Sequence, residues 1–320
     1  MIQKIAITRR WPSQVEQEAK ALGEVTFNVS DRPWTRDELA EALCTHDILC
    51  PTVTDHLPAE LLRLPDRRAG LIANFGVGFN HIDMEAAREQ GILVSNTPGV
   101  LTEATAEIAL NLLLSVARRT GEGERLVREG RWEGWHPTHM LSTQVTGKHL
   151  GIVGMGRIGL ALAKAAHFGL GMRISYYNRN RLDPEVEAEL QARWLPLLEL
   201  LAQADFVSLH CPANAQTRHL IDADALDCMS EHAFLINTAR GDVVDEHALV
   251  AALQNGGIAG AGLDVYETEP RLTPGLDALD NVVLLPHMGS GTTQTRVAMG
   301  RCVLANVAAY IAEHTLPNAV

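Results

Sequence analysis

The chain lacks the features that mark several classes of protein. Aromatic residues make up only 5% of its 320 residues. Its richest apolar stretch, residues 109–117, is far shorter than the ~18 apolar residues that a membrane-spanning helix needs. The five cysteines are odd in number and scattered, so they do not suggest a disulfide framework. We therefore expect a soluble protein of the reducing cytoplasm.

Basic charge is also in short supply. The formal net charge is −12, which disfavours nonspecific binding to nucleic acid or to an anionic membrane, because either partner requires a broad basic surface. A small anionic substrate remains compatible with this charge if basic residues cluster locally.

The chain does contain a regular alternation of short apolar runs with helical stretches, which indicates βα units and parallel sheets. Five such runs lie in the first hundred residues, beginning with "KIAITR", which reads as a first strand rather than a signal peptide. Six more lie between residues 148 and 286. The length suits about two domains of roughly 150 residues each. The predicted fold class is therefore α/β, with two parallel-sheet domains.

Two long helical patterns flank the second series. Residues 101–130 predict a helix that links the two series and is broken near Gly121 and Gly123. Residues from 292 onward predict a further amphipathic helix, and periodicity alone leaves open whether it returns to the first domain.

The most informative local motif is "GIVGMGRIG", in which Gly154, Gly156 and Gly159 match G-x-G-x-x-G. A buried-type strand precedes it and a helical pattern follows. In that setting the glycines allow a tight turn, a close approach to a pyrophosphate and close packing of helix on strand. The motif predicts a dinucleotide-binding site at a helix N-terminus.

The second strand of this series departs from the usual pattern. An acidic residue normally follows it, about 20 residues beyond the glycines, and binds the adenosine ribose. This chain has Asn178, Arg179 and Arg181 there instead. Guanidinium groups suit a 2′-phosphate, so we expect NADP(H) to be preferred, with NAD(H) possible. The alternative is that the arginines are simply the solvated end of a loop.

Three polar residues follow later strands of the same series, namely Arg240, Glu269 and His287. Each alone has a structural explanation, as a solvated cation, a loop cap or a structural histidine. Together they supply what carbonyl reduction requires. The guanidinium can bind a carboxylate and polarise a carbonyl, and the imidazolium can donate a proton. A neighbouring carboxylate favours the charged imidazole.

With these motifs in order, the chain resembles the D-isomer-specific 2-hydroxyacid dehydrogenases, most closely the glyoxylate and hydroxypyruvate reductase branch. The resemblance covers most of the chain after residue 70, through "NFGVGFNHID", "GIVGMGRIG", "NTARGDVVDE", "GLDVYETEP" and "LLPHMGSGT". It implies that His287 is the acid/base, that Glu269 pairs with it, and that Arg240 binds the substrate. It also implies that Asp264 accepts from the nicotinamide carboxamide.

The resemblance extends the predicted sites. The implied catalytic residues are Arg240, Glu269 and His287. The implied substrate-binding residues are Val77, Gly78, Arg240, Ser290 and Trp135 of the partner subunit. The cofactor site predicted from the motifs and the resemblance together comprises Thr105, Gly154, Gly156, Arg157, Ile158, Gly159, Asn178, Arg179, Arg181, His210, Cys211, Pro212, Thr217, Thr238 and Asp264.

The resemblance also implies a domain arrangement. Residues 1–99 and 288–320 would form a discontinuous substrate-binding domain, and residues 100–287 a Rossmann domain with a dimerisation arm at about 101–145. The two Rossmann-like or flavodoxin-like domains would enclose an active-site cleft, and the protein would be a homodimer. The aromatic residue Trp135 has an alternative role as a plain interface residue.

Several functions remain open at this point. The leading expectation is NADPH-preferring reduction of glyoxylate and hydroxypyruvate to glycolate and D-glycerate. Larger 2-oxo acids such as 2-ketogluconate are alternatives, as is a dinucleotide-sensing corepressor-like binding protein. Formate dehydrogenases lack the Glu and His pair, and phosphite dehydrogenases carry a lysine that "NFGVGFNHID" lacks. No paired spacing of a structural zinc site occurs, and the proposed chemistry needs no metal.

Overall fold

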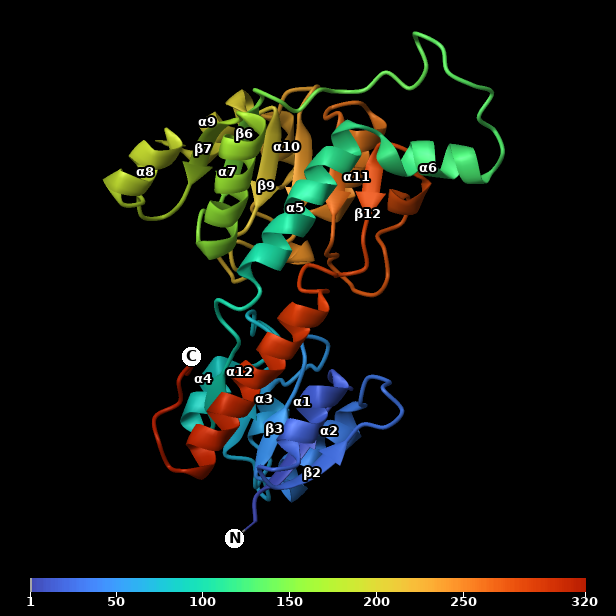
Figure 1. Cartoon of the computed structure of the whole chain (residues 1–320). Helices are drawn as coiled ribbons and strands as arrows, with labels where there is room; N and C mark the ends of the chain where they lie inside the picture. Colours follow the sequence, from blue (N-terminus) through green and yellow to red (C-terminus); the bar gives the residue numbers. More distant parts are fainter. Residues whose placement is uncertain (1) are drawn as a thin grey trace. The chain divides into compact units, whose positions relative to one another are not determined.

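The computed structural model describes residues 2–320, which divide into two compact units (Figure 1). The first unit comprises the residues up to Leu101 together with Ser290–Val320, and the second comprises Thr102–Gly289. Each unit contains its own parallel sheet, as the sequence predicts.

The first unit has a five-stranded sheet in the order β2-β1-β3-β4-β5, in which every pair is parallel. Its strands are the five predicted apolar runs: β1 (Lys4–Ile7), β2 (Glu24–Phe27), β3 (Ile48–Cys50), β4 (Leu71–Ala73) and β5 (Leu93–Ser95). Its helices are α1 (Ser13–Ala19), α2 (Arg36–Thr45), α3 (Ala59–Leu62), α4 (Met84–Glu89) and α12 (Thr293–Ile311). Strands β3 and β4 are entirely buried, which explains their continuous apolar sequence.

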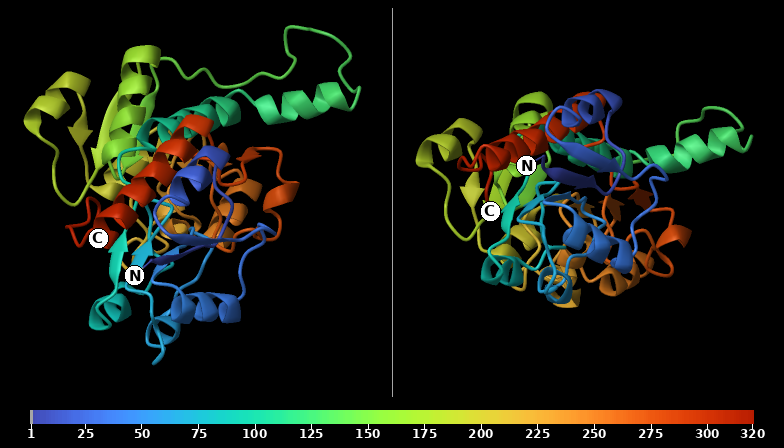
Figure 2. Two further views of the ribbon diagram at one scale, coloured as in Figure 1. Left: turned by 60° about the horizontal axis from the view of Figure 1, so that its bottom comes forward. Right: turned by 90° about the horizontal axis from the view of Figure 1, so that it is seen from below.

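The C-terminal helix α12 packs within this first unit. It lies against α1 and β4, as Figure 2 shows for the red and dark blue helices. Gly300 allows the close approach, because a Cβ there would lie 2.6 Å from Cγ1 of Val15. Arg301 also forms an ion pair with Glu18 at 2.7 Å. The last residues then pair with the sheet edge, where Ala319 lies antiparallel to β5.

The second unit has a seven-stranded parallel sheet in the order β12-β11-β10-β9-β6-β7-β8. Its strands are β6 (His149–Val153), β7 (Arg173–Tyr177), β8 (Arg193–Trp194), β9 (Phe206–Leu209), β10 (Phe234–Asn237), β11 (Gly260–Leu263) and β12 (Val282–Leu284). The sequence predicts all of these except the two-residue β8. The strand order reverses between β6 and β9, and open α/β sheets bind ligands at such a switch point.

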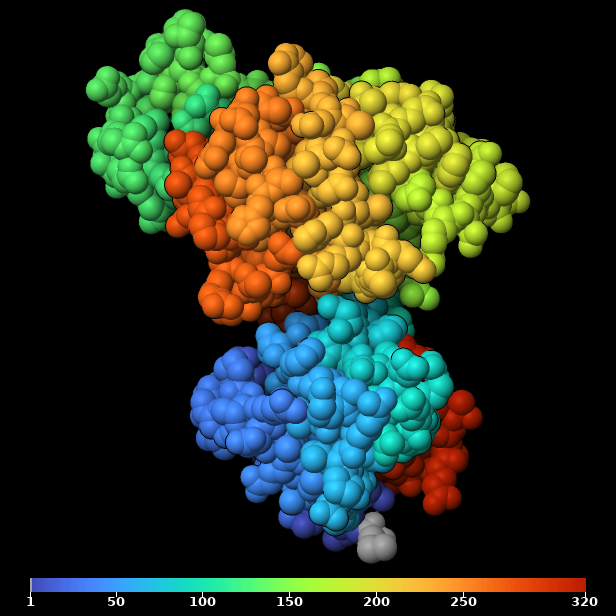
Figure 3. All heavy atoms as spheres, turned by 180° about the vertical axis from the view of Figure 1, so that it is seen from behind, coloured from blue at the N-terminus to red at the C-terminus, as the bar shows by residue number. Residues whose placement is uncertain are grey.

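Helices cover both faces of this second sheet. On one face, α5 (Thr102–Ala117) packs against α7 (Arg157–Leu170) and against β10 and β11 (Figure 1). Elsewhere the unit contains α8 (Pro184–Leu190), α9 (Leu197–Gln203), α10 (Ala223–Asp227), η1 (Gly241–Val243), α11 (Glu246–Gln254) and η2 (Leu276–Ala278). Figure 3 shows the opposite face, where the yellow and orange segments around α10 and α11 form a continuous surface. Each face has its own cluster of buried apolar side chains.

The predicted break in the linking helix is in a different place. Helix α5 ends at Ala117 and α6 (Thr120–Arg128) begins three residues later, so Gly121 and Gly123 lie inside α6. The break is at Arg119, whose φ of 53° is left-handed. Two hydrogen bonds from its guanidinium to Glu122, at 2.7 and 2.8 Å, hold this conformation. The arm formed by α6 and the loop up to residue 145 projects from the unit (Figure 2, green).

Candidate active site

The glycine-rich loop that joins β6 to α7 is tightly packed at two of its glycines. Gly154 has a φ of 93°, and a Cβ there would lie 2.5 Å from the backbone nitrogen of Cys211. A Cβ on Gly159 would lie 2.8 Å from the carbonyl oxygen of Gly154, so the helix packs tightly on the loop. Gly156 differs, because a Cβ there would meet no atom within 4 Å. No side chain caps this helix N-terminus, so it fits an approaching pyrophosphate.

Asn178, at the end of β7, holds this loop in place. Its Oδ1 accepts a hydrogen bond from the Met155 amide at 2.6 Å, and its Nδ2 donates to the Met155 carbonyl at 3.3 Å. The geometry gives Asn178 a structural contact with the glycine-rich loop, and the predicted contact of this residue with the cofactor stays a prediction.

The two arginines that follow Asn178 are in different situations. Arg181 forms an ion pair with Glu187 of α8 at 2.7 Å, and this carboxylate also accepts from Tyr176. Arg179 is exposed, and its side chain makes no hydrogen bond or ion pair within residues 2–320. Of these two arginines, only Arg179 therefore lacks an ionic partner within residues 2–320.

The loops after β9 and β10 bring further predicted residues together. The His210 Nε2 lies 2.9 Å from the Ser208 hydroxyl, and burial lowers the pKa of His210 to about 4, so the ring is neutral. Two buried polar atoms, the His210 Nδ1 and the Thr238 Oγ1, have no hydrogen-bond partner in the part of the chain that the structure describes. Such atoms normally find a partner, so their positions fit a bound polar group.

The other predicted residues of these loops are also placed by local contacts. The Thr217 hydroxyl donates to the Pro212 carbonyl at 2.6 Å. Burial raises the pKa of Cys211 to about 11, so its thiol stays protonated. Thr105, in the first turn of α5, lies beside Gly289, since a Cβ on that glycine would be 3.3 Å from the threonine methyl.

His287, which follows β12, is paired with Glu269. The His287 Nδ1 lies 2.8 Å from Oε2 of Glu269, whose Oε1 accepts from the Tyr266 amide at 3.1 Å. Burial opposes ionisation of Glu269, but the hydrogen bond from His287 and the charge of Arg240 contribute to a lowered pKa. Burial lowers the pKa of Arg240, and the charge of Glu269 opposes this shift. The three predicted catalytic residues thus interact electrostatically within the second unit.

The backbone at His287 is unusual and firmly anchored. Its φ of 51° lies in the left-handed region, which few residues other than glycine adopt. The buried Asp264 carboxylate accepts from the amides of Met288 and Gly289, both at 2.7 Å. On the other side, the Tyr266 hydroxyl donates to the Leu285 carbonyl at 2.8 Å. Asp264, predicted to bind the nicotinamide, therefore also fixes the loop of the histidine.

Glu246, at the start of α11, is a buried carboxylate that the sequence does not single out. It accepts from the Glu267 amide at 2.9 Å and from the Thr273 hydroxyl. These bonds tie down both ends of the segment that carries Glu269. Burial raises the pKa of Glu246. Its only signal in the sequence is an acidic residue at a helix start, which is too common to be diagnostic.

The remaining predicted substrate residues lie elsewhere. Val77, Gly78 and Ser290 belong to the first unit, where Val77 and Gly78 form part of the loop after β4. Trp135 lies in the arm of the second unit, and 81% of its surface is exposed. Within residues 2–320 no cluster of three or more potential metal ligands occurs, and no helix is long and apolar enough to cross a membrane.

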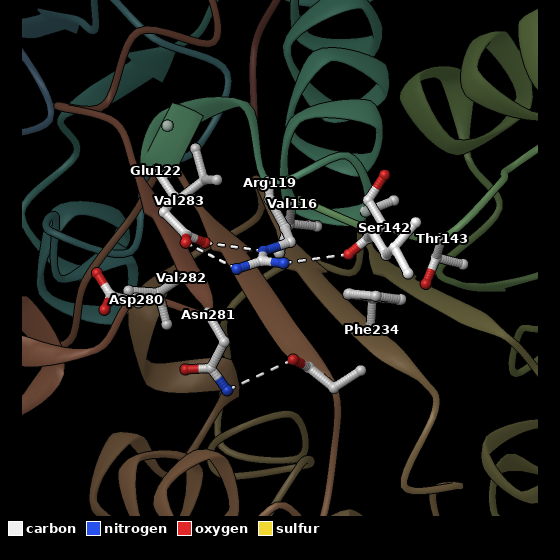
Figure 4. Close-up of a pocket in the computed structure, with 14 residues that line it drawn as sticks. Val116, Arg119, Glu122, Ser142, Thr143, Phe234, Asp280, Asn281, Val282 and Val283 are labelled. Atoms are coloured by element: carbon white, nitrogen blue, oxygen red, sulfur yellow. Dashed lines mark hydrogen bonds and ion pairs between the residues drawn. The ribbon is translucent and has the colours of Figure 1, made fainter. Parts of the chain in front are cut away.

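A pocket of about 310 Å³ lies at the root of the arm, and His287 is not among the residues that line it. Figure 4 shows Arg119 in this pocket, with its guanidinium directed towards Glu122 and the backbone carbonyl of Leu141. Asp280 and Asn281 also line the pocket. Because its cation is already paired, the pocket does not resemble a site for an anionic substrate.

Comparison with known proteins identifies the family of this chain. The sequence profile described as "D-isomer specific 2-hydroxyacid dehydrogenase, NAD binding domain" matches residues 110–289. A glyoxylate reductase from Thermococcus litoralis is 44% identical over 321 residues, which cover 99% of this chain and 96% of that protein. The chain belongs to the D-isomer-specific 2-hydroxyacid dehydrogenase family. Within it, this NAD(P)-dependent dehydrogenase falls in the glyoxylate reductase branch, which confirms the resemblance.

Solved structures of the family resemble this dehydrogenase over its whole length. A glyoxylate reductase from Paecilomyes thermophila superposes with a TM-score of 0.88 at 34% identity, covering 100% of this chain and 98% of that one. An NADPH-dependent glyoxylate/hydroxypyruvate reductase from Sinorhizobium meliloti, solved in complex with NADP and malonate, gives 0.87 at 34% identity, covering 100% and 97%. The α/β fold with two parallel-sheet domains is thereby confirmed.

Proposed function

We propose that this dehydrogenase reduces glyoxylate and hydroxypyruvate to glycolate and D-glycerate, with NADPH preferred over NADH. The observation that carries the proposal is the pairing of His287 with Glu269, with Arg240 acting electrostatically on the same carboxylate. The names of the relatives supply the substrate class, since those compared above are glyoxylate or glyoxylate/hydroxypyruvate reductases.

His287 is the proton donor in this proposal. Its Nδ1–H donates to the Glu269 carboxylate, which leaves Nε2 for the substrate. In the charged ring, Nε2–H gives its proton to the carbonyl oxygen of the 2-oxo acid. When bound, the nicotinamide supplies the hydride that the carbonyl carbon accepts. His287 becomes neutral in this step and must regain a proton before the next turnover.

Substrate binding is assigned to charge and to backbone amides. The Arg240 guanidinium offers parallel donors, so it can hold the substrate carboxylate and polarise the adjacent carbonyl. The amides of Val77 and Gly78 would hold the same carboxylate, and Ser290 is a further candidate contact. A substrate anion would also stabilise the buried cation of Arg240, whose pKa burial lowers.

The preference for NADPH rests on Arg179. This residue is exposed and unpaired within residues 2–320, whereas Arg181 is bound by Glu187. No acidic side chain stands at position 178 to repel a 2′-phosphate. We therefore assign the main contact with that phosphate to Arg179, and a smaller contribution to Arg181.

We further propose that the enzyme is a homodimer joined through the arm. Four large apolar side chains are exposed there, namely Val127, Trp132, Trp135 and Leu141. Apolar side chains gathered on a projecting segment are typical of an interface. The arm would place Trp135 near the substrate of the partner subunit.

Initial rates test the cofactor and the substrate together. NADPH and NADH are each oxidised against glyoxylate, hydroxypyruvate, pyruvate and 2-ketogluconate. The NADPH advantage should shrink about tenfold in Arg179→Ala and less in Arg181→Ala, in line with ~1.4 kcal/mol for one charge-assisted contact. Arg88→Ala, an exposed arginine of the first unit, is the control. Equal use of both cofactors by the wild type would refute the preference.

The roles at the reacting atoms need separate variants. His287→Ala should lose most of kcat while it keeps NADPH binding, and Arg240→Ala should chiefly raise KM for the 2-oxo acid. Near-wild-type kcat/KM in either variant would contradict its assignment. Turnover of none of the four acids would refute the proposed substrate class.

A further inference from the structure

The loop after β4 is held by two asparagine side chains that the catalytic proposal does not use. Asn74 follows β4 and Asn96 follows the neighbouring strand β5, so both rise from one edge of the sheet. The Asn74 Nδ2 donates to the carbonyls of Gly76 at 3.0 Å and Gly78 at 2.9 Å. The Asn96 Nδ2 donates to the carbonyl between them, that of Val77, at 2.8 Å. Three successive backbone carbonyls of this loop therefore accept hydrogen bonds from the two asparagine side chains.

Peptide geometry then fixes where the amides point. In a trans peptide the carbonyl and the following N–H are antiparallel. Because the carbonyls of residues 76–78 point to the asparagines, the N–H groups of Val77, Gly78 and Phe79 point away from them. None of these three amides donates a hydrogen bond within the described part of the chain. Successive free amides of this kind form a binding site for an anion.

The arrangement has little freedom to change. Asn74 is completely buried, and its Oδ1 lies 3.0 Å from the His81 Nε2, which sets the orientation of the amide. The Gly76 carbonyl also accepts from the Thr97 amide at 3.1 Å. A Cβ on Gly76 would lie 2.9 Å from Cγ1 of Val53, so the loop is packed against its surroundings.

We propose that Asn74 and Asn96 are positioning residues that aim the amides of Val77 and Gly78 at the substrate carboxylate. This inference rests on the proposed function, in which those amides bind that carboxylate. An asparagine suits the task at position 74, because its neutral amide supplies two donors without placing a charge beside the anion. Neither asparagine touches the substrate in this assignment.

Kinetics test the effect on the substrate. In Asn74→Ala and Asn96→Ala, KM for glyoxylate should rise at least tenfold with a smaller change in kcat, while the Kd for NADPH stays within twofold. Asn74→Asp keeps the size of the side chain and an acceptor for His81, but it loses both donors, so it should fail in the same way. Unchanged KM in both alanine variants would overturn the inference.

A matched control separates positioning from general loosening. Asn28, in the same unit, also bridges two carbonyls through Nδ2, those of Thr8 and Arg32, each at 2.7 Å. Asn28→Ala removes as many side-chain hydrogen bonds as Asn74→Ala does. It should therefore lower Tm, but it should not raise KM for glyoxylate. An equal rise in KM for Asn28→Ala would mean that loss of stability, rather than amide orientation, explains the effect.

A crystal structure of Asn74→Ala distinguishes this inference from the proposed function. We expect the Gly76 or Gly78 peptide to rotate in that variant. If both carbonyls keep their direction, the positioning role is wrong, whatever the enzyme reduces. If the wild type reduces no 2-oxo acid, the proposed function fails, while the rotated peptide would still support the role of Asn74 in orienting the loop.

Discussion

The charge on Glu269 should contribute to the rate of reduction through its hydrogen bond with His287. The two side chains form a hydrogen bond of 2.8 Å between Oε2 and Nδ1. Glu269→Gln keeps the size of the side chain and an oxygen that can accept this bond, but it removes the negative charge. The variant therefore loses the electrostatic part of its contact with the imidazole.

The size of the effect follows from the geometry. A hydrogen bond to a charged group contributes about 1.5–3 kcal/mol. The side chains of His287 and Glu269 are 31% and 29% exposed, so solvent screening favours the lower end of this range. The lower end of this range, about 1.5 kcal/mol, corresponds to roughly a tenfold lower kcat/KM.

The assay is kcat/KM for glyoxylate reduction at neutral pH, with the Kd for NADPH measured separately. The variant should be about tenfold slower than the wild type, while its Kd for NADPH stays within about twofold. Glu267→Gln is the control, because that carboxylate bonds His219 at 2.5 Å instead. An unchanged kcat/KM in Glu269→Gln, or an equal loss in Glu267→Gln, would refute this reasoning.

Three further predictions concern the framework of the site. Gly154→Ala should destabilise the fold by about 3 kcal/mol or more in urea unfolding, because φ is 93° and the new Cβ would clash with backbone atoms. Gly156→Ala should keep the stability of the wild type, but it should bind NADPH at least tenfold more weakly in a binding titration. Burial lowers the pKa of His210 to about 4, so between pH 6.5 and 4 only the unfolded chain gains this proton. Unfolding experiments should show up to about 3 kcal/mol of stability lost as the pH falls through that window, and His210→Asn should remove this loss. Asp264→Asn should lower kcat roughly 10- to 100-fold in steady-state assays, because it replaces one of two acceptors that anchor the loop of His287.

The sequence predicts the two sheets well, because parallel strands buried on both faces leave a continuous apolar signal. Strand β8 escapes prediction since it has only two residues, Arg193 and Trp194, and one of them is charged. The sequence does not predict the position of the helix break at Arg119 for another reason. Its left-handed backbone depends on the side chain of Glu122, whereas sequence reasoning assigns such breaks to glycine.

The sequence indicates candidate polar residues of the site, but not what holds them in place. Arg240, Glu269 and His287 stand out because each follows a strand at one edge of the sheet. Their supports cannot be found in this way. Glu246 binds Thr273, 27 residues away, and nothing in the local sequence of either residue indicates the other.

The conformation of His287 explains why these supports are needed. A left-handed residue other than glycine costs of order 1–3 kcal/mol and persists only where its surroundings require it. Asp264 holds this conformation by accepting hydrogen bonds from the amides of Met288 and Gly289, and Tyr266 holds it by donating a hydrogen bond to the carbonyl of Leu285. These contacts hold the backbone in the conformation that lets Nδ1 meet Glu269 at 2.8 Å. In the proposed mechanism, the hydrogen bonds around the strained residue thereby determine which ring nitrogen faces the substrate.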